Sequence, residues 1–353
     1  MAQKHRIPLH FSRIRKFKKE KIEILAGDIG GTKTNLALYE AFEGALQIKA
    51  EATYASSSFS SCIQILKKMK SEHPDLNPER ICLGVAGPVL NGKVELTNLD
   101  WNLNASEILR ETQVSEVALI NDLEATAYGL AALDENDFIT IHQGEVEYPG
   151  NLAIIAPGTG LGEGGLYWDG SSYHPFATEG GHTDFGARTR EDVELLEFLT
   201  GKYGIVSWEK VIAGPAIADI YEFLRAKASA MEPAWLTEEL EKGDRSALIS
   251  NLAIDEKDPI CMQTMLVFVR YLARQSSNLV LTMKATGGLY LGGGIPPKIA
   301  PLLLQPSYYH NFLDADRMQH LLKKVPLKII RNSKAAMIGA ALYGAYGAAL
   351  ENS

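Results

Sequence analysis

Gly27-Asp-Ile-Gly-Gly-Thr-Lys-Thr34 is a glycine- and threonine-rich stretch that directly follows an apolar, strand-like run at Ile22–Ala26. A second stretch of this kind, Ala156-Pro-Gly-Thr-Gly-Leu-Gly162, follows the apolar run Leu152–Ile155. Glycine lets backbone N–H groups approach an anion closely, and threonine adds a hydroxyl donor. Two such loops that face one another would hold a polyphosphate from both sides. The pair therefore predicts a nucleotide-binding protein built from two similar half-domains.

Neither loop matches the common nucleotide-binding motifs. The spacing Gly-x4-Gly-Lys-[Ser/Thr] of a P-loop is absent from both. Gly160-Leu-Gly-Glu-Gly-Gly165 does satisfy Gly-x-Gly-x-x-Gly, and Glu179 follows at about the distance of a ribose-binding acid. These glycines lead into an extended stretch, Gly165–Trp168, whereas a dinucleotide-binding fold requires a helix there. The sequence therefore argues against a Rossmann domain.

The order of predicted elements is that of a mixed α/β protein. Strands are predicted at Ile22–Asp28, Asn35–Glu40, Gln47–Tyr54, Ile81–Ala86, Val117–Ile120, Leu152–Ala156, Gly165–Trp168, Gly288–Gly292 and Lys324–Arg331. Helices are predicted from Phe59 to Met69 and at Asp122–Leu133, Glu191–Gly201, Pro215–Ala226, Ile260–Lys284 and Ala335–Leu350. The second glycine loop and its strands resemble the first, which indicates an internal duplication.

Length and composition are those of a two-domain enzyme. The 353 residues are 46% hydrophobic, and no stretch reaches the roughly 20 apolar residues of a membrane span. The three cysteines, Cys62, Cys82 and Cys261, have no short spacing, so we expect neither a disulfide framework nor a thiolate metal site. The N-terminus lacks the apolar region of a signal peptide. These features predict a cytoplasmic protein.

The charge is unevenly distributed along the chain. Residues 1–21 contain eight Lys or Arg and one Glu, which leaves a net charge of −15 on the remainder of a chain whose total is −8. Such a basic tail could contact nucleic acid or an anionic membrane. The alternative, which we favour, is a solvated and flexible extension without a partner. The acidic remainder argues against nucleic acid as the main partner.

Two aspartates stand where predicted strands end. Asp28, beside Gly30 and Gly31, could meet a phosphate-bound Mg²⁺ directly or through water, because Mg²⁺ takes only one or two carboxylates. It could instead be a turn aspartate bonded to its own backbone, and we favour the metal role. Asp122, after Asn121, could be only a favourable first residue of a helix. Alternatively it lies at the carboxyl end of a strand, where it could accept a hydroxyl proton during phosphoryl transfer.

The motif Glu179-Gly-Gly-His182 favours an enzyme that binds a polar ligand. Two adjacent glycines let the backbone bend sharply, so a carboxylate and an imidazole can face one ligand, such as adjacent sugar hydroxyls. His182 could also be a zinc ligand. The following stretch, Thr183–Arg190, supplies no cysteine and no second histidine, so we disfavour that role.

The motifs together resemble those of bacterial glucokinases, ATP-dependent members of the actin/hexokinase/Hsp70-like superfamily. The resemblance runs from about Ile22 to about Leu350. It is carried, in family order, by Asp28-Ile-Gly-Gly-Thr-Lys-Thr-Asn35, Leu119-Ile-Asn-Asp-Leu-Glu124, Pro157-Gly-Thr-Gly-Leu-Gly162, Glu179-Gly-Gly-His-Thr-Asp-Phe185 and Val211-Ile-Ala-Gly-Pro215. The cysteine cluster that binds zinc in the related ROK kinases is missing after Glu-Gly-Gly-His.

The resemblance implies a role for each matching residue. Asp122 would be the catalytic base for the sugar 6-hydroxyl, and Asp28 would face Mg²⁺. The remaining hydroxyls of the sugar would be held by Asn121, Glu179, His182 and Glu209. The nucleotide would be bound by Gly30, Gly31 and Thr32 of the first loop, by Gly158, Thr159 and Gly160 of the second, and by Gly293 at the adenosine pocket.

The implied fold is two actin-like, ribonuclease H-like α/β domains with mixed central sheets that flank a hinged cleft. The expected domains are a flexible extension at 1–21, a smaller domain at 22–131 plus 334–353, and a larger domain at 132–333. The helix-turn-helix of a DNA-binding regulator has no room in the roughly 20 residues before the kinase core.

The resulting prediction is a glucokinase that uses ATP and Mg²⁺ to phosphorylate D-glucose at its 6-hydroxyl. Its partners would be glucose and ATP, with no nucleic acid or membrane, and a homodimer is a common state of such kinases. A kinase for another hexose, mannose or fructose, is the nearest alternative. A catalytically silent sugar sensor, or a nucleotide-driven assembly or chaperone protein, is an alternative of another class. Retention of Asp122, Glu179 and His182 argues against both members of that class.

Overall fold

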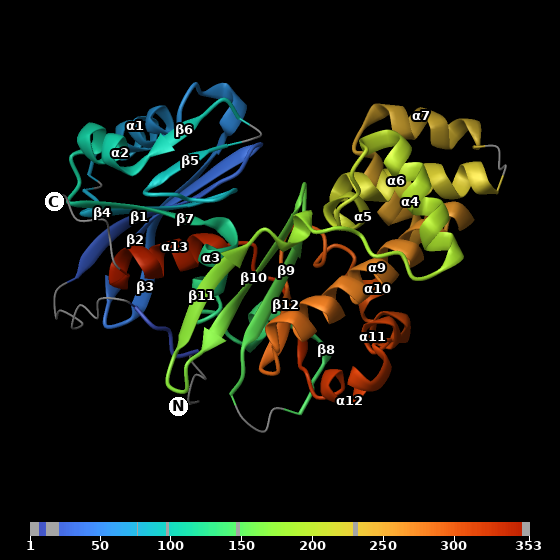
Figure 1. Ribbon diagram of the computed structural model, residues 1–353. Helices are drawn as coiled ribbons and strands as arrows, with labels where there is room; N and C mark the ends of the chain where they lie inside the picture. Colours follow the sequence, from blue (N-terminus) through green and yellow to red (C-terminus); the bar gives the residue numbers. More distant parts are fainter. Residues whose placement is uncertain are drawn as a thin grey trace. The chain divides into compact units, whose positions relative to one another are not determined.

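The computed structural model describes residues 7–11, 21–75, 77–96, 99–145, 149–228 and 232–347. The described chain forms two compact units (Figure 1). The first contains the residues up to Glu135, the segment Leu166–Ala177 and the residues from Asn332 onward. The second contains Asn136–Gly165 and Thr178–Arg331.

The first unit is built on a five-stranded sheet with the order β3-β2-β1-β4-β7. Its strands are β1 (Ile22–Ile29), β2 (Lys33–Phe42), β3 (Ala45–Ala55), β4 (Arg80–Val85) and β7 (Glu116–Asn121). β2 is antiparallel to β1 and β3, whereas β1, β4 and β7 are parallel. Ile29 lies opposite Val85, and Val85 lies opposite Asn121, so the three parallel strands end at one edge.

Helices cover both faces of this sheet because its strands are apolar on both sides (Figure 1). Leu25, Leu83 and Val117 face helices α1 (Cys62–Glu72) and α2 (Ala105–Thr112). On the opposite face, small residues of the same strands pack against α3 (Asp122–Gly129) and α13 (Ala335–Tyr346). The predicted C-terminal helix is thus confirmed over 335–346.

The α3–α13 contact depends on glycine. A Cβ atom at Gly339 would lie 1.7 Å from the Ala125 carbonyl oxygen, and one at Gly129 would lie 2.1 Å from that of Ala335. No side chain fits at either distance, so the two helix backbones meet without intervening side chains. This close approach explains why the C-terminal helix is so rich in alanine and glycine.

The second unit holds most of a six-stranded sheet with the order β11-β10-β9-β12-β13-β8. Residues 166–177, which include the end of β10 and nearly all of β11, are assigned to the first unit. Its strands are β8 (Phe138–His142), β9 (Leu152–Pro157), β10 (Leu161–Trp168), β11 (Tyr173–Thr178), β12 (Gly288–Leu291) and β13 (Leu327–Ile330). β9, β12 and β13 are parallel, and β8 is antiparallel to β13. The first five places repeat the connectivity of the other sheet. The predicted fold class, two α/β halves with mixed sheets, is confirmed.

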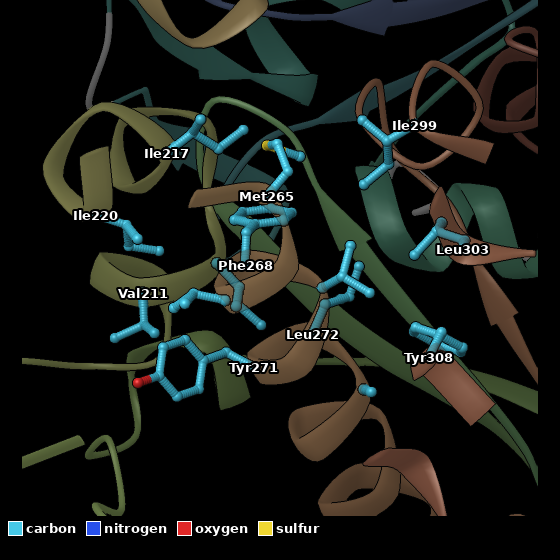
Figure 2. Packing of buried hydrophobic residues seen from close by; sticks show 14 of the residues in the cluster. Val211, Ile217, Ile220, Met265, Phe268, Tyr271, Leu272, Ile299, Leu303 and Tyr308 are labelled. Atoms are coloured by element: carbon cyan, nitrogen blue, oxygen red, sulfur yellow. The ribbon is translucent and has the colours of Figure 1, made fainter. Parts of the chain in front are cut away.

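The core of the second unit is organised around α9 (Pro259–Met283). Met265, Phe268 and Leu272 of this helix belong to the same buried cluster as Ile217 and Ile220 of α6 (Gly214–Lys227), part of which is drawn in Figure 2. The cluster extends to α8 (Arg245–Ile254), α10 (Ala300–Leu303) and α11 (Pro306–Phe312). A helix of 25 residues buried along most of its length fits the predicted Ile260–Lys284.

The other elements are short or peripheral. They are α4 (Arg190–Tyr203), α5 (Glu209–Ile212), α7 (Ala234–Lys242), α12 (Gln319–Leu322), the two-stranded ribbon β5 (Lys93–Glu95) and β6 (Asn102–Asn104), and the 3₁₀ turns η1 (Ser56–Ser58), η2 (Glu135–Asp137), η3 (Gly180–His182) and η4 (Asp316–Met318). Within the described chain, none of the helices has the length and hydropathy of a membrane-spanning segment. Cys62, Cys82 and Cys261 are buried and unbridged.

Residues 7–11 of the basic N-terminal extension contact the folded chain. The amide of His10 donates to the Tyr173 carbonyl (2.8 Å), and the amide of Tyr173 donates to the Pro8 carbonyl (2.7 Å), which adds Leu9 beside β11 as a parallel bridge. Phe11 stacks on Tyr128 with ring centroids 5.8 Å apart. For these residues the structure differs from the expected solvated extension. Residues 1–6 and 12–20 lie outside the described chain.

Candidate active site

The first glycine loop is the turn between β1 and β2. The amide of Gly30 donates to the Lys33 carbonyl at 2.9 Å, which closes the turn. Ser56 holds the loop from behind: its hydroxyl donates to the Gly30 carbonyl (2.8 Å) and its amide donates to the Thr32 carbonyl (3.0 Å). Ser56 is fully buried, whereas Thr32 is exposed. Ser56 has no marked role in the sequence, because its link to the loop exists only once the chain is folded.

Asp28 lies on β1 opposite Asn35 of β2. Its carboxyl group is half-buried, and burial raises its pKa, an effect that a hydrogen bond from Asn35 partly offsets. Burial limits the hydration of the ionised carboxylate, so a nearby cation would stabilise this charged form. The environment therefore suits the predicted metal role.

Asn121 and Asp122 form the junction of β7 and α3. The Asn121 side-chain oxygen accepts hydrogen bonds from the amides of Leu123 (2.8 Å) and Glu124 (3.3 Å), so Asn121 caps the helix. Its side-chain nitrogen donates to the Gly87 carbonyl at 3.1 Å. Asp122 Oδ1 accepts from the Leu123 amide at 2.9 Å. The visible role of Asn121 is to fix this junction, and a sugar-binding role for it stays a prediction.

The sugar-binding candidates Glu179, His182 and Glu209 lie together in the second unit. His182 Nδ1 is 3.7 Å from Glu179 Oε2, and His182 Nε2 is 4.0 Å from Glu209 Oε1. The side chains of Glu179 and His182 are 60% and 62% exposed, so both can reach a ligand in solvent. Backbone bonds from Trp208 to Thr183 and from Phe185 to Val206, each 3.0 Å, align the two segments.

The second glycine loop adjoins these residues. The Leu161 amide donates to Glu209 Oε2 at 3.1 Å, and a Cβ atom at Gly160 would lie 2.7 Å from the same oxygen. The Gly214 amide donates to the Gly158 carbonyl at 2.7 Å. The loop and Glu209 therefore belong to one local structure, and a side chain at position 160 would displace the Glu209 carboxylate.

Gly293 closes the other side of the second loop. Its φ of +78° is in the left-handed region, and a Cβ atom there would lie 2.5 Å from the Pro157 carbonyl oxygen. The Ile295 amide donates to the same oxygen at 3.3 Å. Because β9 and β12 are parallel and in register, the loop after β9 and the triple glycine after β12 lie at one sheet edge. Open α/β sheets bind ligands at such edges.

A buried carboxyl group that the sequence analysis missed lies beneath the Glu179–His182 turn. Glu163 of β10 is 2% exposed, and its Oε1 accepts a hydrogen bond from Gln275 Nε2 of α9 at 2.8 Å. Its Oε2 lies against Gly180, where a Cβ atom would be 2.2 Å away. Burial raises the pKa of Glu163, which the Gln275 hydrogen bond partly offsets. Glu163 was visible only as one letter of a weak Gly-x-Gly-x-x-Gly match.

The predicted residues fall into two groups, each at the carboxyl edge of parallel strands. The first unit brings Asp28, the first glycine loop, Asn121 and Asp122 to the shared edge of β1, β4 and β7. The second unit brings Glu179, His182, Glu209, the second glycine loop and Gly293 together. The catalytic, sugar-binding and nucleotide-binding roles of these residues stay predictions.

Comparisons with known proteins identify the family of the chain. The protein-family model described as Glucokinase matches residues 25–346. A glucokinase of Trichormus variabilis is 36% identical over 338 residues, covering 91% of this chain and 98% of the relative.

Solved structures give the same picture. The crystal structure of a glucokinase from an Antarctic psychrotroph has 33% identity and a TM-score of 0.78, and the match covers 91% of this chain and 98% of that one. A glucokinase from Balamuthia mandrillaris, solved in complex with glucose, shares the fold at 22% identity with a TM-score of 0.77, covering 93% and 94% of the two chains. The resemblance inferred from the motifs is confirmed: the chain belongs to the glucokinase family.

Proposed function

We propose that the chain transfers the γ-phosphoryl group of ATP to the 6-hydroxyl of D-glucose, giving glucose 6-phosphate and ADP. The observation that carries the proposal is the grouping of Glu179, His182 and Glu209 beside the second glycine loop. The names of the relatives and the glucose complex of the Balamuthia mandrillaris enzyme support glucose as the acceptor.

In this proposal the sugar is recognised by charged and polar side chains. Two carboxylates accept hydrogen bonds from neighbouring hydroxyls, and the imidazole donates or accepts at a third. Hydrogen bonds to charged groups are stronger than those between neutral groups, so such a site strongly favours a polyhydroxylated ligand. Glu209 also accepts from the Leu161 amide, which keeps its carboxylate in a fixed position.

Asp122 accepts the proton of the 6-hydroxyl as that oxygen attacks the γ-phosphorus. An ordinary carboxylate is a weak base, but phosphoryl transfer has a loose transition state in which positioning and charge stabilisation supply most of the catalysis. The two glycine loops, Gly30–Thr32 and Gly158–Gly160, bind the phosphates through backbone and hydroxyl donors. The amides of Gly30 and Gly158 shape these loops, because they donate to the Lys33 and Gly160 carbonyls.

Mg²⁺ would be held near Asp28, directly or through water, and would neutralise phosphate charge when bound. The half-buried carboxylate of Asp28 fits a cation, because burial raises its pKa and a positive charge would reverse that effect. Asp28 and the glycine loop are adjacent along the chain, so a metal there would lie next to the bound phosphates.

The test is ADP release by the purified protein with Mg-ATP. The reaction is run without sugar and with glucose, mannose, fructose or N-acetylglucosamine. Release that depends on glucose, with a low background in its absence, is the expected result. Turnover only with another sugar would keep the kinase chemistry and replace the acceptor. Sugar-independent hydrolysis, or no turnover with any of these sugars, would contradict the proposal.

A further inference from the structure

Two imidazoles and a carboxylate lie close together on the surface of the first unit. One of the three residues is more than 150 positions away from the other two in the sequence. They belong to His10 of the N-terminal segment and to Asp169 and His174 of the β10–β11 hairpin. One potential ligand atom from each residue lies within 4.8 Å of the other two. None of these residues has a part in the proposed kinase chemistry.

The hairpin turn fixes Asp169 in place. Its Oδ1 accepts hydrogen bonds from the amides of Ser171 (2.7 Å) and Ser172 (2.8 Å) and from the Ser171 hydroxyl (2.9 Å). Its Oδ2 lies 2.6 Å from His174 Nε2 and also accepts from the Ser172 hydroxyl at 3.2 Å. The carboxylate is thus oriented before any ligand binds, with Oδ2 directed at an imidazole.

The backbone holds His10 beside this pair. The His10 amide and the Pro8 carbonyl both bond to Tyr173, the neighbour of His174 in the chain. The rings of His10 and His174 stack at a centroid distance of 4.2 Å with 22° between their planes. Because His10 and Asp169 are exposed and His174 is half-buried, an ion can reach the group from solvent.

We propose that His10, Asp169 and His174 bind one Zn²⁺ or a similar borderline cation such as Ni²⁺. Two imidazole nitrogens and one carboxylate oxygen are a donor set that such ions prefer, whereas Mg²⁺ prefers oxygen ligands alone. Zinc lies about 2.0–2.2 Å from nitrogen and oxygen ligands, so atoms within 4.8 Å of one another come into range through rotation of side chains. Water would complete the tetrahedron.

The consequence of such binding is a cross-link between the N-terminal segment and the hairpin. Without the ion, residues 7–11 are held by the two backbone bonds to Tyr173 and by the packing of Leu9 and Phe11. Zinc would join His10 to two residues that follow it by more than 150 positions in the sequence. It would therefore slow the local opening of the segment.

The first experiment measures zinc binding to the full chain after treatment with EDTA, by competition with a chromophoric chelator. We expect one Zn²⁺ per chain, no competition from Mg²⁺, and an affinity that His10→Ala and His174→Ala each reduce by at least about tenfold. His310→Ala is the matched control, because His310 is an exposed histidine of α11. Unchanged zinc affinity in both ligand variants, or the absence of micromolar binding, would overturn the proposal.

Hydrogen exchange tests the cross-link itself. The amides of His10 and Tyr173 report on opening of the segment, because they donate the two bonds that attach it. Zinc should slow their exchange severalfold in the wild-type chain and leave it unchanged in His174→Ala. Equal protection by zinc in both proteins would place the ion elsewhere and contradict the assignment.

Discussion

Asp122 is held at the start of α3 by the backbone on both sides of it. The cap formed by Asn121 and the bond from the Leu123 amide fix the junction, and neither contact depends on a bound sugar or nucleotide. We expect Asp122→Asn to lower kcat by about 10²–10⁴, the usual contribution of a general base, with little change in the KM for glucose.

Glu107→Gln is the control for that variant. Glu107 is an exposed acid in the first turn of another helix, α2, of the same unit. It should behave like the wild-type enzyme in steady-state kinetics. Near-normal turnover by Asp122→Asn would remove Asp122 from the proton-transfer step.

Glu163 supports the turn that carries Glu179 and His182. Truncation to alanine leaves the side-chain nitrogen of Gln275 without its Glu163 acceptor and opens space beneath Gly180. We expect Glu163→Ala to raise the KM for glucose about tenfold or more with little change in the KM for ATP. Glu163→Gln keeps the shape and a hydrogen-bonding group, so it should restore most of the glucose affinity. If both KM values rise together in Glu163→Ala, the residue supports the whole unit rather than the sugar-binding turn.

Whether a residue's role could be predicted depended on how far its partner lies from it in the sequence. The motifs identified Glu179 and His182 as neighbours on one turn, and the structure places them 3.7 Å apart. Ser56 and Glu163 escaped notice because their partners, Gly30 and Gly180, lie 26 and 17 positions away, on other elements. A serine or glutamate carries no sign of such a partner until the strands are paired.

At the element scale, the α3–α13 contact gives a stability prediction. Gly339→Ala places a methyl group where the Ala125 carbonyl already lies, so the helices must separate. We expect the free energy of unfolding to fall by about 1–3 kcal/mol or more, measured by urea denaturation.

Gly201→Ala provides the contrast. Gly201 lies in α4 with no atom within 4 Å of the added methyl, so this variant should be neutral or gain up to about 1 kcal/mol. A similar effect of the two substitutions would show that close helix contact is not what requires Gly339.

The α4–α9 contact contains a buried ion pair. Asp192 is fully buried and accepts from Arg274 Nη1 (2.7 Å), from the Tyr271 hydroxyl (3.0 Å) and from the Arg188 amide (2.8 Å). Burial alone would raise the pKa of Asp192, but these donors outweigh it and lower the pKa to about 2.

The lowered pKa of Asp192 determines how stability depends on pH. A carboxylate with a depressed folded-state pKa stabilises the fold above its unfolded pKa, near 4, and loses that effect as the pH falls toward 2. We expect a loss of about 2 kcal/mol across that interval in acid titrations of unfolding. Asp192→Asn should be less stable at neutral pH and should lack this part of the acid transition. A parallel acid response in both proteins would contradict the assignment.

Most long elements were predictable because their patterns are local. The strands around both glycine loops, α9 and α13 match within a few residues, since each is a long run of apolar residues with clear ends. β8 and β11 were not predicted. Both are short and only partly buried, so no clear alternation of apolar residues marks them.

For the whole molecule, we expect ligand binding to raise the free energy of unfolding. A sugar that binds only the folded chain raises the free energy of unfolding by about 2.7 kcal/mol when its concentration is one hundred times its Kd. We expect glucose to raise the melting temperature of the wild-type chain and to have much less effect on Glu179→Gln. An identical shift in the two proteins would exclude Glu179 from glucose binding.

The whole-molecule architecture was the most predictable level. Two similar glycine loops indicated a duplicated α/β fold, and the two sheets share the order of their first five strands. The assignment of Leu166–Ala177 to the first unit was not predictable. It involves contacts such as the Leu9–Tyr173 bridge, between segments that no motif connects.

The burial of the three cysteines makes each unit report its own unfolding. Burial raises the pKa of Cys62 to about 12 and also raises the pKa of Cys82 and Cys261, so almost no thiolate forms in the native chain at neutral pH. An alkylating reagent can therefore modify them only after an opening event. Because Cys62 and Cys82 belong to one unit and Cys261 to the other, the order of labelling under mild denaturant reveals which unit opens first.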